Sequence, residues 1–477
     1  MSGIAGIINF NKKPVEKSTL NNMLTAIAHR GPDGREVWLK NNAGLGFVKL
    51  ETGNVGPQPF VLDDKIAVVL DGAIYNRDEL RDQIKKQGLQ FRGESDAELL
   101  AHLYNLSGER CLEQINGMFS LAIRDEVKNI LLLARDRIGM KSCYYYSGPD
   151  YFAFGSEVKA LLALPGVNAE LYPPALIEYC TYQNILTEKT LFKGIKKVQP
   201  ACYLIITEGK IEKKRYWQPH LAKTDLGAEE KYIAEFQKLF PKAVKRTIPG
   251  VSFGSFLSGG FDSTSVAAIA RKYSETPLDT FCGYYPEGEA FDESAIAEEV
   301  SERIGSAFHK VPITPKDYLN VIDKVIYHLE EPTTGSAAFA YYLVSGKAAE
   351  KVKVMLTGHG GDELFGGYPA YKVAWFKERL KSNPLEIFRI FREIKGWEWA
   401  KILYFWIYPL FQPNVRYGLY TMFPEKAQKE LFQPEFIQAA ADLESPTISS
   451  ELIEDNNLPL DDQIFYLYLS GYLPTLV

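Results

Sequence analysis

The sequence predicts a two-part α/β protein, with a strand-rich N-terminal half followed by a half in which strands and helices alternate. Its 477 residues are enough for two or three domains. The change in pattern falls across Pro219–Lys231, a polar stretch that we assign as the linker. The apolar fraction of 46% and the charged fraction of 24% are those of an ordinary globular protein.

Short runs rich in Ile, Val, Tyr and Phe dominate the first half and favour strands. Two stretches between them have helical patterns, Glu98–Tyr104 and Ser156–Leu164. The predicted strands are Gly3–Phe10, Lys65–Leu70, Phe119–Arg124, Ile130–Ala134, Tyr151–Phe154 and Ala201–Ile206.

The second half alternates strand and helix patterns, which predicts parallel βαβ units. The tail from about Trp375 is expected to be helical and rich in aromatic residues. The predicted elements are strands at Val251–Leu257, Asp279–Tyr284 and Val352–Leu356, with helices at Ser263–Tyr273 and Glu293–Ile304.

Charge and cysteine content exclude several classes of protein. A net charge of −6 argues against coating a nucleic acid, because phosphates need a positive partner surface. Five scattered cysteines without C-x-x-C pairs form neither a disulfide framework nor a zinc signature, which favours reduced thiols in the cytoplasm. The start of the chain lacks the pattern of a secretory signal. The apolar stretch Ile402–Phe411 has ten residues and a membrane span needs about 20, so we expect a buried helix or a partner-facing surface there.

A glycine turn between a predicted strand and a predicted helix is the strongest local motif. It reads Ser258-Gly259-Gly260-Phe261-Asp262-Ser263. Glycines let backbone N–H groups approach an anion, and the helix start adds its positive dipole end. Asp262 is suited to hold Mg²⁺, which takes carboxylates together with phosphate oxygens. The competing interpretation is a capped structural turn without a ligand; the chain has no GxxxxGK[ST] motif.

A second glycine turn, Thr357–Tyr368, follows the predicted strand Val352–Leu356 and contains Asp362. If both strands belong to one parallel sheet, Asp262 and Asp362 lie at its carboxyl edge, where open α/β folds bind ligands. Two carboxylates at that edge predict a magnesium–pyrophosphate site.

These motifs resemble a known family. SGGFDS resembles the PP-loop of ATP pyrophosphatases, and with FDES, LEEP and GGDELFGGY the region 230–370 resembles the synthetase domain of asparagine synthetase B. The resemblance implies that a carboxylate is adenylated by ATP with Mg²⁺ and that ammonia then displaces AMP. It also implies that the segment Leu329–Tyr342 lines the acceptor pocket. The implied cofactor-binding residues are Leu257, Cys282 and Gly283 near adenine, Ser258, Gly259, Gly260, Asp262 and Ser263 at pyrophosphate, and Gly360 and Gly361 in the second turn, with Asp262 and Asp362 as metal ligands.

The N-terminal half resembles the N-terminal-nucleophile glutaminase of the same family from Met1 to Trp217. The resemblance rests on MSGIAGI, HRGPDG, GAIYNRDELR, SDAELL, NGMFSLAI, ARDRIGMKSCYY and FGSEVKALL. It implies an Ntn-hydrolase-type αββα sandwich over 1–218, followed by a Rossmann-like PP-loop domain with a helical extension over 230–477. In the family, an N-terminal cysteine exposed by Met removal attacks glutamine, with its own amine as base.

Four positions of the glutamine pocket depart from the family pattern, so we expect this domain to be inactive. Ser2 replaces the cysteine, and Lys49 replaces an arginine that holds the glutamine carboxylate. In Asp71-Gly72-Ala73 an acceptor-only carboxylate replaces the oxyanion-hole asparagine, and the glutamate for the substrate amine is absent. Asp96 alone matches. Natural loss is favoured over an engineered Cys-to-Ser change, which would alter one position.

The chain ends in the apolar stretch Tyr472–Val477, whereas the family's synthetase domain continues with a DR-x-SMA-type segment and a lysine. We therefore expect a partner chain, or self-association as a homo-oligomer, to complete the domain, or the sequence to be truncated. His359 stands at the family's glutamate position in the second turn and is a candidate general base, although lone histidines are more often solvated or in the core.

Three functions remain open. The first is an amide ligase that uses ammonia or an amine and keeps an inactive glutaminase domain. β-Lactam synthetases and lasso-peptide cyclases resemble this domain arrangement. The second is an asparagine synthetase still driven by glutamine through Ser2. The third is a non-catalytic nucleotide-binding assembly protein. The sequence does not identify the carboxylate acceptor.

Overall fold

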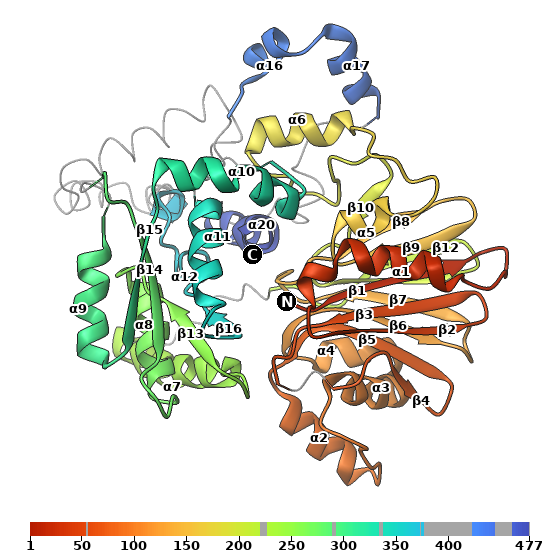
Figure 1. The fold of residues 1–477 in the computed structure, drawn as a ribbon, viewed down its shortest axis with the longest axis horizontal. Coiled ribbons are helices and arrows are strands. Elements are labelled where there is room, and N and C mark those ends of the chain that lie inside the picture. Colours follow the sequence, from red (N-terminus) through yellow and green to blue (C-terminus); the bar gives the residue numbers. More distant parts are fainter. Residues whose placement is uncertain are drawn as a thin grey trace.

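The computed structural model describes residues 1–53, 56–219, 227–288, 292–332, 337–372, 374–375, 422–443 and 460–476 (Figure 1). The mixed α/β class predicted from the sequence is confirmed: two antiparallel sheets form from residues before the predicted linker, and one parallel sheet forms from residues after it. The stretch Ile402–Phe411 and most of the predicted aromatic-rich tail lie outside the described residues.

Two six-stranded sheets face each other in the N-terminal body. The first has the order β10-β8-β9-β1-β3-β2, and the second the order β12-β11-β7-β6-β5-β4. The strands of the first are β1 (Gly3–Asn9), β2 (Gly34–Lys40), β3 (Ala43–Lys49), β8 (Tyr144–Ser147), β9 (Tyr151–Gly155) and β10 (Ile195–Lys197). Those of the second are β4 (Phe60–Leu62), β5 (Ile66–Ile74), β6 (Gly117–Asp125), β7 (Ile130–Arg135), β11 (Cys202–Thr207) and β12 (Lys210–Arg215).

Three apolar clusters hold these layers together. Side chains of both sheets meet in the middle, among them Ile4, Phe47 and Val69. Helices cover the outer faces, because α1 (Lys17–Ala26) and α5 (Val158–Leu162) pack on the first sheet while α3 (Asp96–Ser107) packs on the second. The remaining helices of this body are α2 (Arg77–Lys86), α4 (Cys111–Gln114) and α6 (Pro173–Tyr182).

A four-stranded parallel sheet with the order β15-β14-β13-β16 forms the second body. Its strands are β13 (Phe253–Phe256), β14 (Asp279–Tyr284), β15 (Ala307–Pro312) and β16 (Val354–Leu356). The strand β15 was not predicted from the sequence. The helices are α7 (Glu229–Thr247), α8 (Phe261–Arg271), α9 (Ser294–Ile304), α10 (Pro315–Leu329), α11 (Ala337–Ala348) and α12 (Gly361–Phe365).

The last described residues form α16 (Glu425–Leu431), α17 (Pro434–Leu443), α19 (Leu460–Leu467), the π-helical turn Tyr468–Tyr472 and α20 (Leu473–Leu476). Leu467 and Tyr468 belong to a buried cluster with Ala370 and Ala374. Leu473 is buried too. Among the described residues, no helix is both long and apolar enough to cross a membrane.

Candidate functional sites

The two glycine turns lie side by side, as predicted, because β13 pairs in parallel with β16. Ser255 lies opposite Leu356, so both strands end at the same edge. A Cβ atom on Gly361 would lie 2.4 Å from the Asp262 carboxylate carbon. A Cβ atom on Gly358 would lie 2.6 Å from the Ser263 amide nitrogen. Glycine at both positions is therefore what allows the second turn to pack against the first.

Hydroxyl groups hold the first turn in shape. The hydroxyl oxygens of Ser258 and Ser263 lie 2.9 Å apart, and the Ser258 amide donates to the Ser263 oxygen at 3.1 Å. The Gly260 amide donates to the Ser258 oxygen at 3.3 Å. Gly259 has a φ of +83°, in the left-handed region that favours glycine. The chain then enters α8, whose first turn carries Asp262.

Both turns open on one cavity of about 620 Å³, a size typical of small-molecule sites. Gly259 is not part of the wall, because its backbone packs against Ile296. The rest of the wall includes Ala340, Tyr341 and Val344 of α11. The sequence-predicted residues that line the cavity are Leu257, Ser258, Gly260, Asp262, Ser263, Cys282, Gly283, His359, Gly360, Gly361 and Asp362.

Negative charge gathers at this edge of the cavity. Partial desolvation at the cavity wall, and then the neighbouring charges of Asp362 and Glu363, raise the pKa of the Asp262 carboxyl above its ordinary value. Glu363 is buried, and it accepts a hydrogen bond from the Tyr368 hydroxyl at 2.7 Å. Asp262 and Asp362 are exposed and have mutually repelling charges that a divalent cation would relieve.

A magnesium ion fits these residues only together with further oxygen ligands. In the described part of the chain, no group of three or more His, Cys, Asp or Glu side chains is arranged to hold a metal ion. At nucleotide sites the protein usually supplies one or two carboxylates to Mg²⁺, and phosphate oxygens and water complete the coordination. The pair Asp262 and Asp362 therefore suits a metal that arrives with a polyphosphate.

His359 lies in the cavity wall and contacts a tyrosine that the sequence analysis did not name as a site residue. Its Nε2 atom is 2.8 Å from the hydroxyl oxygen of Tyr341. Desolvation lowers the pKa of the His359 imidazole, so the ring is neutral at pH 7 and can accept a proton. The only sequence signal for Tyr341 was its place near the end of the segment Leu329–Tyr342.

The described residues of the segment Leu329–Tyr342 fall into two groups, one at the cavity and one against the N-terminal body. Ala337, Ala340 and Tyr341 line the cavity as expected. Residues 333–336 lie outside the described residues. The expectation is wrong for Glu330 and Glu331, because their carboxylates contact Lys159 and Lys197 of the N-terminal body instead.

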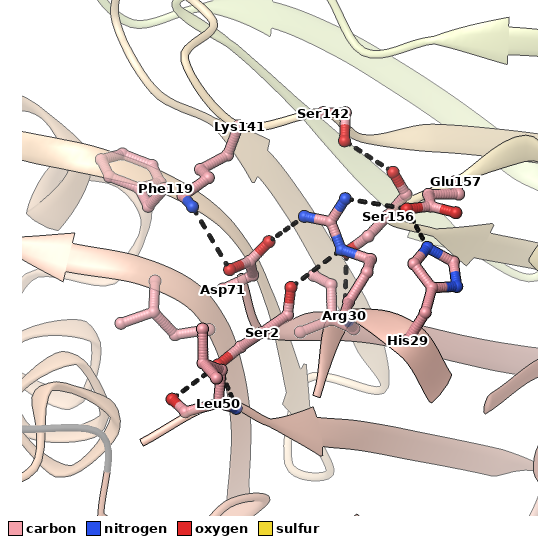
Figure 2. Close-up of polar contacts among 12 residues, drawn as sticks. Ser2, His29, Arg30, Leu50, Asp71, Phe119, Lys141, Ser142, Ser156 and Glu157 are labelled. Carbon is pink, nitrogen blue, oxygen red and sulfur yellow. Dashed lines mark hydrogen bonds and ion pairs between the residues drawn. The ribbon is translucent and has the colours of Figure 1, made fainter. Parts of the chain in front are cut away.

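The position of the family nucleophile lies in a buried polar cluster (Figure 2). The Ser2 hydroxyl accepts from the Leu50 amide at 3.1 Å. Arg30 donates from Nε to the Ser2 carbonyl at 2.9 Å, and its two terminal nitrogens contact Asp71 at 2.8 Å and Glu157 at 3.1 Å. Nζ of Lys141 lies 3.6 Å from Asp71. The Asp71 carboxylate is thus neutralised by two buried cations.

The other residues expected to line a glutamine pocket are also paired with protein groups. Lys49 pairs with Glu51. Asp96 contacts Arg77 at 2.7 Å and accepts from the Ile74 amide at 2.9 Å, and its burial raises the pKa of its carboxyl to about 6.

The two residues after Asp71, Gly72 and Ala73, lie close to the neighbouring strand β6. Gly72 has a φ of +148°, and a Cβ there would lie 2.0 Å from the Met118 carbonyl oxygen. Ala73 pairs with Met118 across β5 and β6. The structure brings Ser2 and Asp71 together through Arg30, but among the described residues no side-chain hydrogen bond or ion pair joins Lys49 or Asp96 to Ser2, Arg30 or Asp71.

Comparisons with known proteins divide the chain in the same way. Residues 1–217 match the family described as glutamine amidotransferase domain, and residues 235–450 match the family described as asparagine synthase. The chain is 32% identical to asparagine synthetase [glutamine-hydrolyzing] 3 of Bacillus subtilis, over 78% of this chain and 64% of that protein.

Two further relatives show the range of printed descriptions. A putative asparagine synthetase [glutamine-hydrolyzing] 2 of Methanocaldococcus jannaschii is 33% identical, over 80% of this chain and 79% of that protein. A protein named amidase chyE, of Penicillium rubens, is 31% identical, over 76% of this chain and 57% of that protein. The chain spans 64% and 61% of the lengths of two Bacillus subtilis asparagine synthetases.

Proposed function

Because this chain belongs to the asparagine synthetase family, we propose that it is an ATP-dependent amide ligase whose chemistry takes place between the two glycine turns. The observation that carries the proposal is the pairing of β13 with β16, which sets Asp262 and Asp362 at one edge of a cavity of about 620 Å³. We assign residues 230–477 to this synthetase function and residues 1–218 to a type 2 glutamine amidotransferase domain that is inactive.

The reaction needs two bond exchanges. In the first, a carboxylate oxygen of the acceptor attacks the α-phosphorus of ATP, the bond to the β-phosphate breaks, and pyrophosphate leaves. In the second, an amine nitrogen attacks the acyl carbon, the bond to AMP breaks, and the nitrogen gives up a proton. Mg²⁺ would supply positive charge to the polyphosphate when bound.

Residues of the chain have distinct parts in this scheme. Amides and hydroxyls of the turn from Ser258 to Ser263 bind the pyrophosphate portion, since glycine turns at helix starts favour anions. The apolar wall at Leu257, Cys282 and Gly283 receives the adenine. His359, neutral at pH 7 and held by Tyr341, accepts the proton released by the amine.

We propose ammonia or another amine, and not glutamine, as the nitrogen donor. In the Ser2 pocket the place of an oxyanion donor is taken by Asp71, a carboxylate that is acceptor-only and already bound by Arg30. Serine is also a weaker nucleophile than cysteine. Glutamine-driven synthesis through Ser2 and nucleotide binding without catalysis are the two alternative outcomes of the test below.

L-Aspartate is the first acceptor to test, because the relatives include asparagine synthetases. The described wall of the cavity carries no lysine or arginine that would hold the second carboxylate of a dicarboxylate, so monocarboxylates belong in the panel beside L-aspartate.

The test measures pyrophosphate release from Mg·ATP with each acceptor, with either ammonium chloride or glutamine. The proposal predicts acceptor-dependent release with ammonium and no glutamate from glutamine. Glutamate release coupled to amide formation would favour the glutamine-dependent enzyme. Binding of Mg·ATP without release of pyrophosphate for any acceptor would favour nucleotide binding without catalysis.

A further inference from the structure

The C-terminal end of α10 inserts an acidic side chain into the N-terminal body. Glu330 ends the helix in the left-handed conformation, with a φ of +61°. Its carboxylate accepts from the amides of Val158 and Lys159, each at 2.6 Å, and lies 2.9 Å from Nζ of Lys159. The Glu330 side chain is only 6% exposed. Three donors converge on one buried carboxylate, which is the arrangement that makes a buried charge tolerable.

Neighbouring residues strengthen the same contact. Glu331 lies 3.3 Å from Nζ of Lys197. The ring of His328 packs edge-on against the ring of His29, with centroids 4.5 Å apart. The ring of Tyr327 lies under the Lys159 ammonium, at 4.8 Å. The end of α10 is therefore held by several groups.

Lys159 also faces inward, towards the Ser2 cluster. Its ammonium lies 2.5 Å from Glu157, which contacts Arg30 at 3.1 Å. Arg30 in turn holds Asp71 and the Ser2 carbonyl. Charges alternate along this series of residues, so each buried ion has oppositely charged neighbours, as a fully paired polar network requires.

The helix anchored in this way supports a wall of the nucleotide cavity. α10 packs on α11 through Tyr318 and Phe339, whose ring centroids are 4.2 Å apart. α11 contributes Ala340, Tyr341 and Val344 to the cavity, and Tyr341 contacts His359. A shift at the end of α10 would therefore move the residues that surround the reacting groups.

We propose that Lys159 and Glu330 are positioning residues, through which the N-terminal body sets the place of α11 in the synthetase cavity. This rests on the proposed ligase function. It gives a domain without glutaminase activity a necessary part in the reaction. A misplacement of about 1 Å can lower a rate on the order of 100-fold, so a fixed wall matters for turnover.

Other ion pairs between the two bodies serve as controls. Lys353 lies 3.3 Å from Asp33, and both side chains are partly exposed. Exposed pairs of this kind contribute little to stability. Lys353→Met therefore removes a cation between the same two bodies without touching α10.

The experiment compares Lys159→Met, Glu330→Gln, the conservative Lys159→Arg and the control Lys353→Met in the full chain. Circular dichroism first selects variants that fold. Hydrogen exchange is then followed in peptides from α11 and, as a reference, from α8. Calorimetry gives the Kd for Mg·ATP, and pyrophosphate release with L-aspartate and ammonium gives kcat/KM.

We expect faster exchange in α11 but not in α8 for Lys159→Met and Glu330→Gln. Their kcat/KM for L-aspartate should fall roughly 10- to 100-fold. The Kd for Mg·ATP should stay within about twofold, because the two glycine turns are untouched. Lys159→Arg and Lys353→Met should behave as the wild type.

Unchanged exchange in α11 together with unchanged kcat/KM would overturn the proposal, as would equal effects of Lys353→Met. If the wild type releases no pyrophosphate with L-aspartate, the rate of hydrogen exchange in α11 alone decides whether Lys159 and Glu330 position this helix. Absence of Mg·ATP binding by the wild type would contradict the ligase function instead, and exchange would still report on the positioning.

Discussion

The guanidinium of Arg30 and the carboxylate of Asp71 form a buried ion pair with a nitrogen–oxygen distance of 2.8 Å. Both side chains are at most 7% exposed. Arg30 also holds the backbone of Ser2 and the carboxylate of Glu157, so one side chain joins three other residues of the cluster around Ser2. The pocket is thus a satisfied structural cluster whose charges already have partners.

Arg30→Met should destabilise the N-terminal body strongly. It leaves Asp71 and Glu157 with fewer cations in a buried setting, and removing one member of a buried ion pair costs about 3–5 kcal/mol. Urea unfolding measures the change. Arg303→Met is the matched control, because its pair with Glu299 is exposed and should change stability by less than about 0.5 kcal/mol. Equal midpoints for the two variants would refute the structural role of Arg30.

Ser2→Cys should not create a glutaminase. The thiol supplies a better nucleophile, but Asp71 still presents a carboxylate where a developing oxyanion needs a donor. Lys49 also remains paired with Glu51. The measurement is glutamate release from glutamine, with the wild type as background. Robust hydrolysis by this single variant would show that the pocket is intact apart from its nucleophile.

Gly361→Ala should abolish tight binding of Mg·ATP, since the new Cβ would lie 2.4 Å from the Asp262 carboxylate carbon and displace that carboxylate. Gly346→Ala is the control, because nothing lies within 4 Å of a Cβ there. Within helix α11 that change should be neutral, or stabilise by about 0.5–1 kcal/mol. Calorimetry compares the two variants. Similar loss of affinity in both would argue against the steric explanation.

Local motifs made the neighbouring positions of the two glycine turns predictable. In both turns a predicted strand runs into a glycine turn that carries an aspartate, so their adjacency followed from parallel pairing alone. The strand β15 was missed because Ala307–Pro312 mixes His, Lys and Pro with apolar residues and lacks the usual alternation.

Long-range polar contacts were not predictable in this way. Asp71 was recognised as a departure from the family pattern, yet nothing near it in the sequence indicated that Arg30 would neutralise it. The contact between Glu330 and Lys159 joins residues from opposite halves of the chain. The motif containing Glu330 was expected to face the cavity, but the left-handed end of α10 carries its side chain to the other body.

The affinity for Mg·ATP should depend on pH through Asp262. Partial desolvation, and then the charges of nearby Asp362 and Glu363, raise the pKa of the Asp262 carboxyl, and only the ionised form binds the metal. The affinity for Mg·ATP should therefore be constant above that pKa and fall as the pH drops through it. Where the Asp262 carboxyl is protonated, binding should release its proton. Calorimetry in buffers of different ionisation heat detects these protons. An affinity that rises on acidification would contradict the assignment.

Titration of Mg·ATP into the wild type and the Asp262→Asn variant tests the central claim most directly, with Asp82→Asn on the exposed face of α2 as control. The two-turn site predicts that Asp262→Asn loses most of the metal-dependent binding, at least about tenfold or 1.4 kcal/mol, while Asp82→Asn binds as the wild type does. Equal Mg·ATP affinity for the wild type and Asp262→Asn would show that the nucleotide binds elsewhere or not at the metal pair.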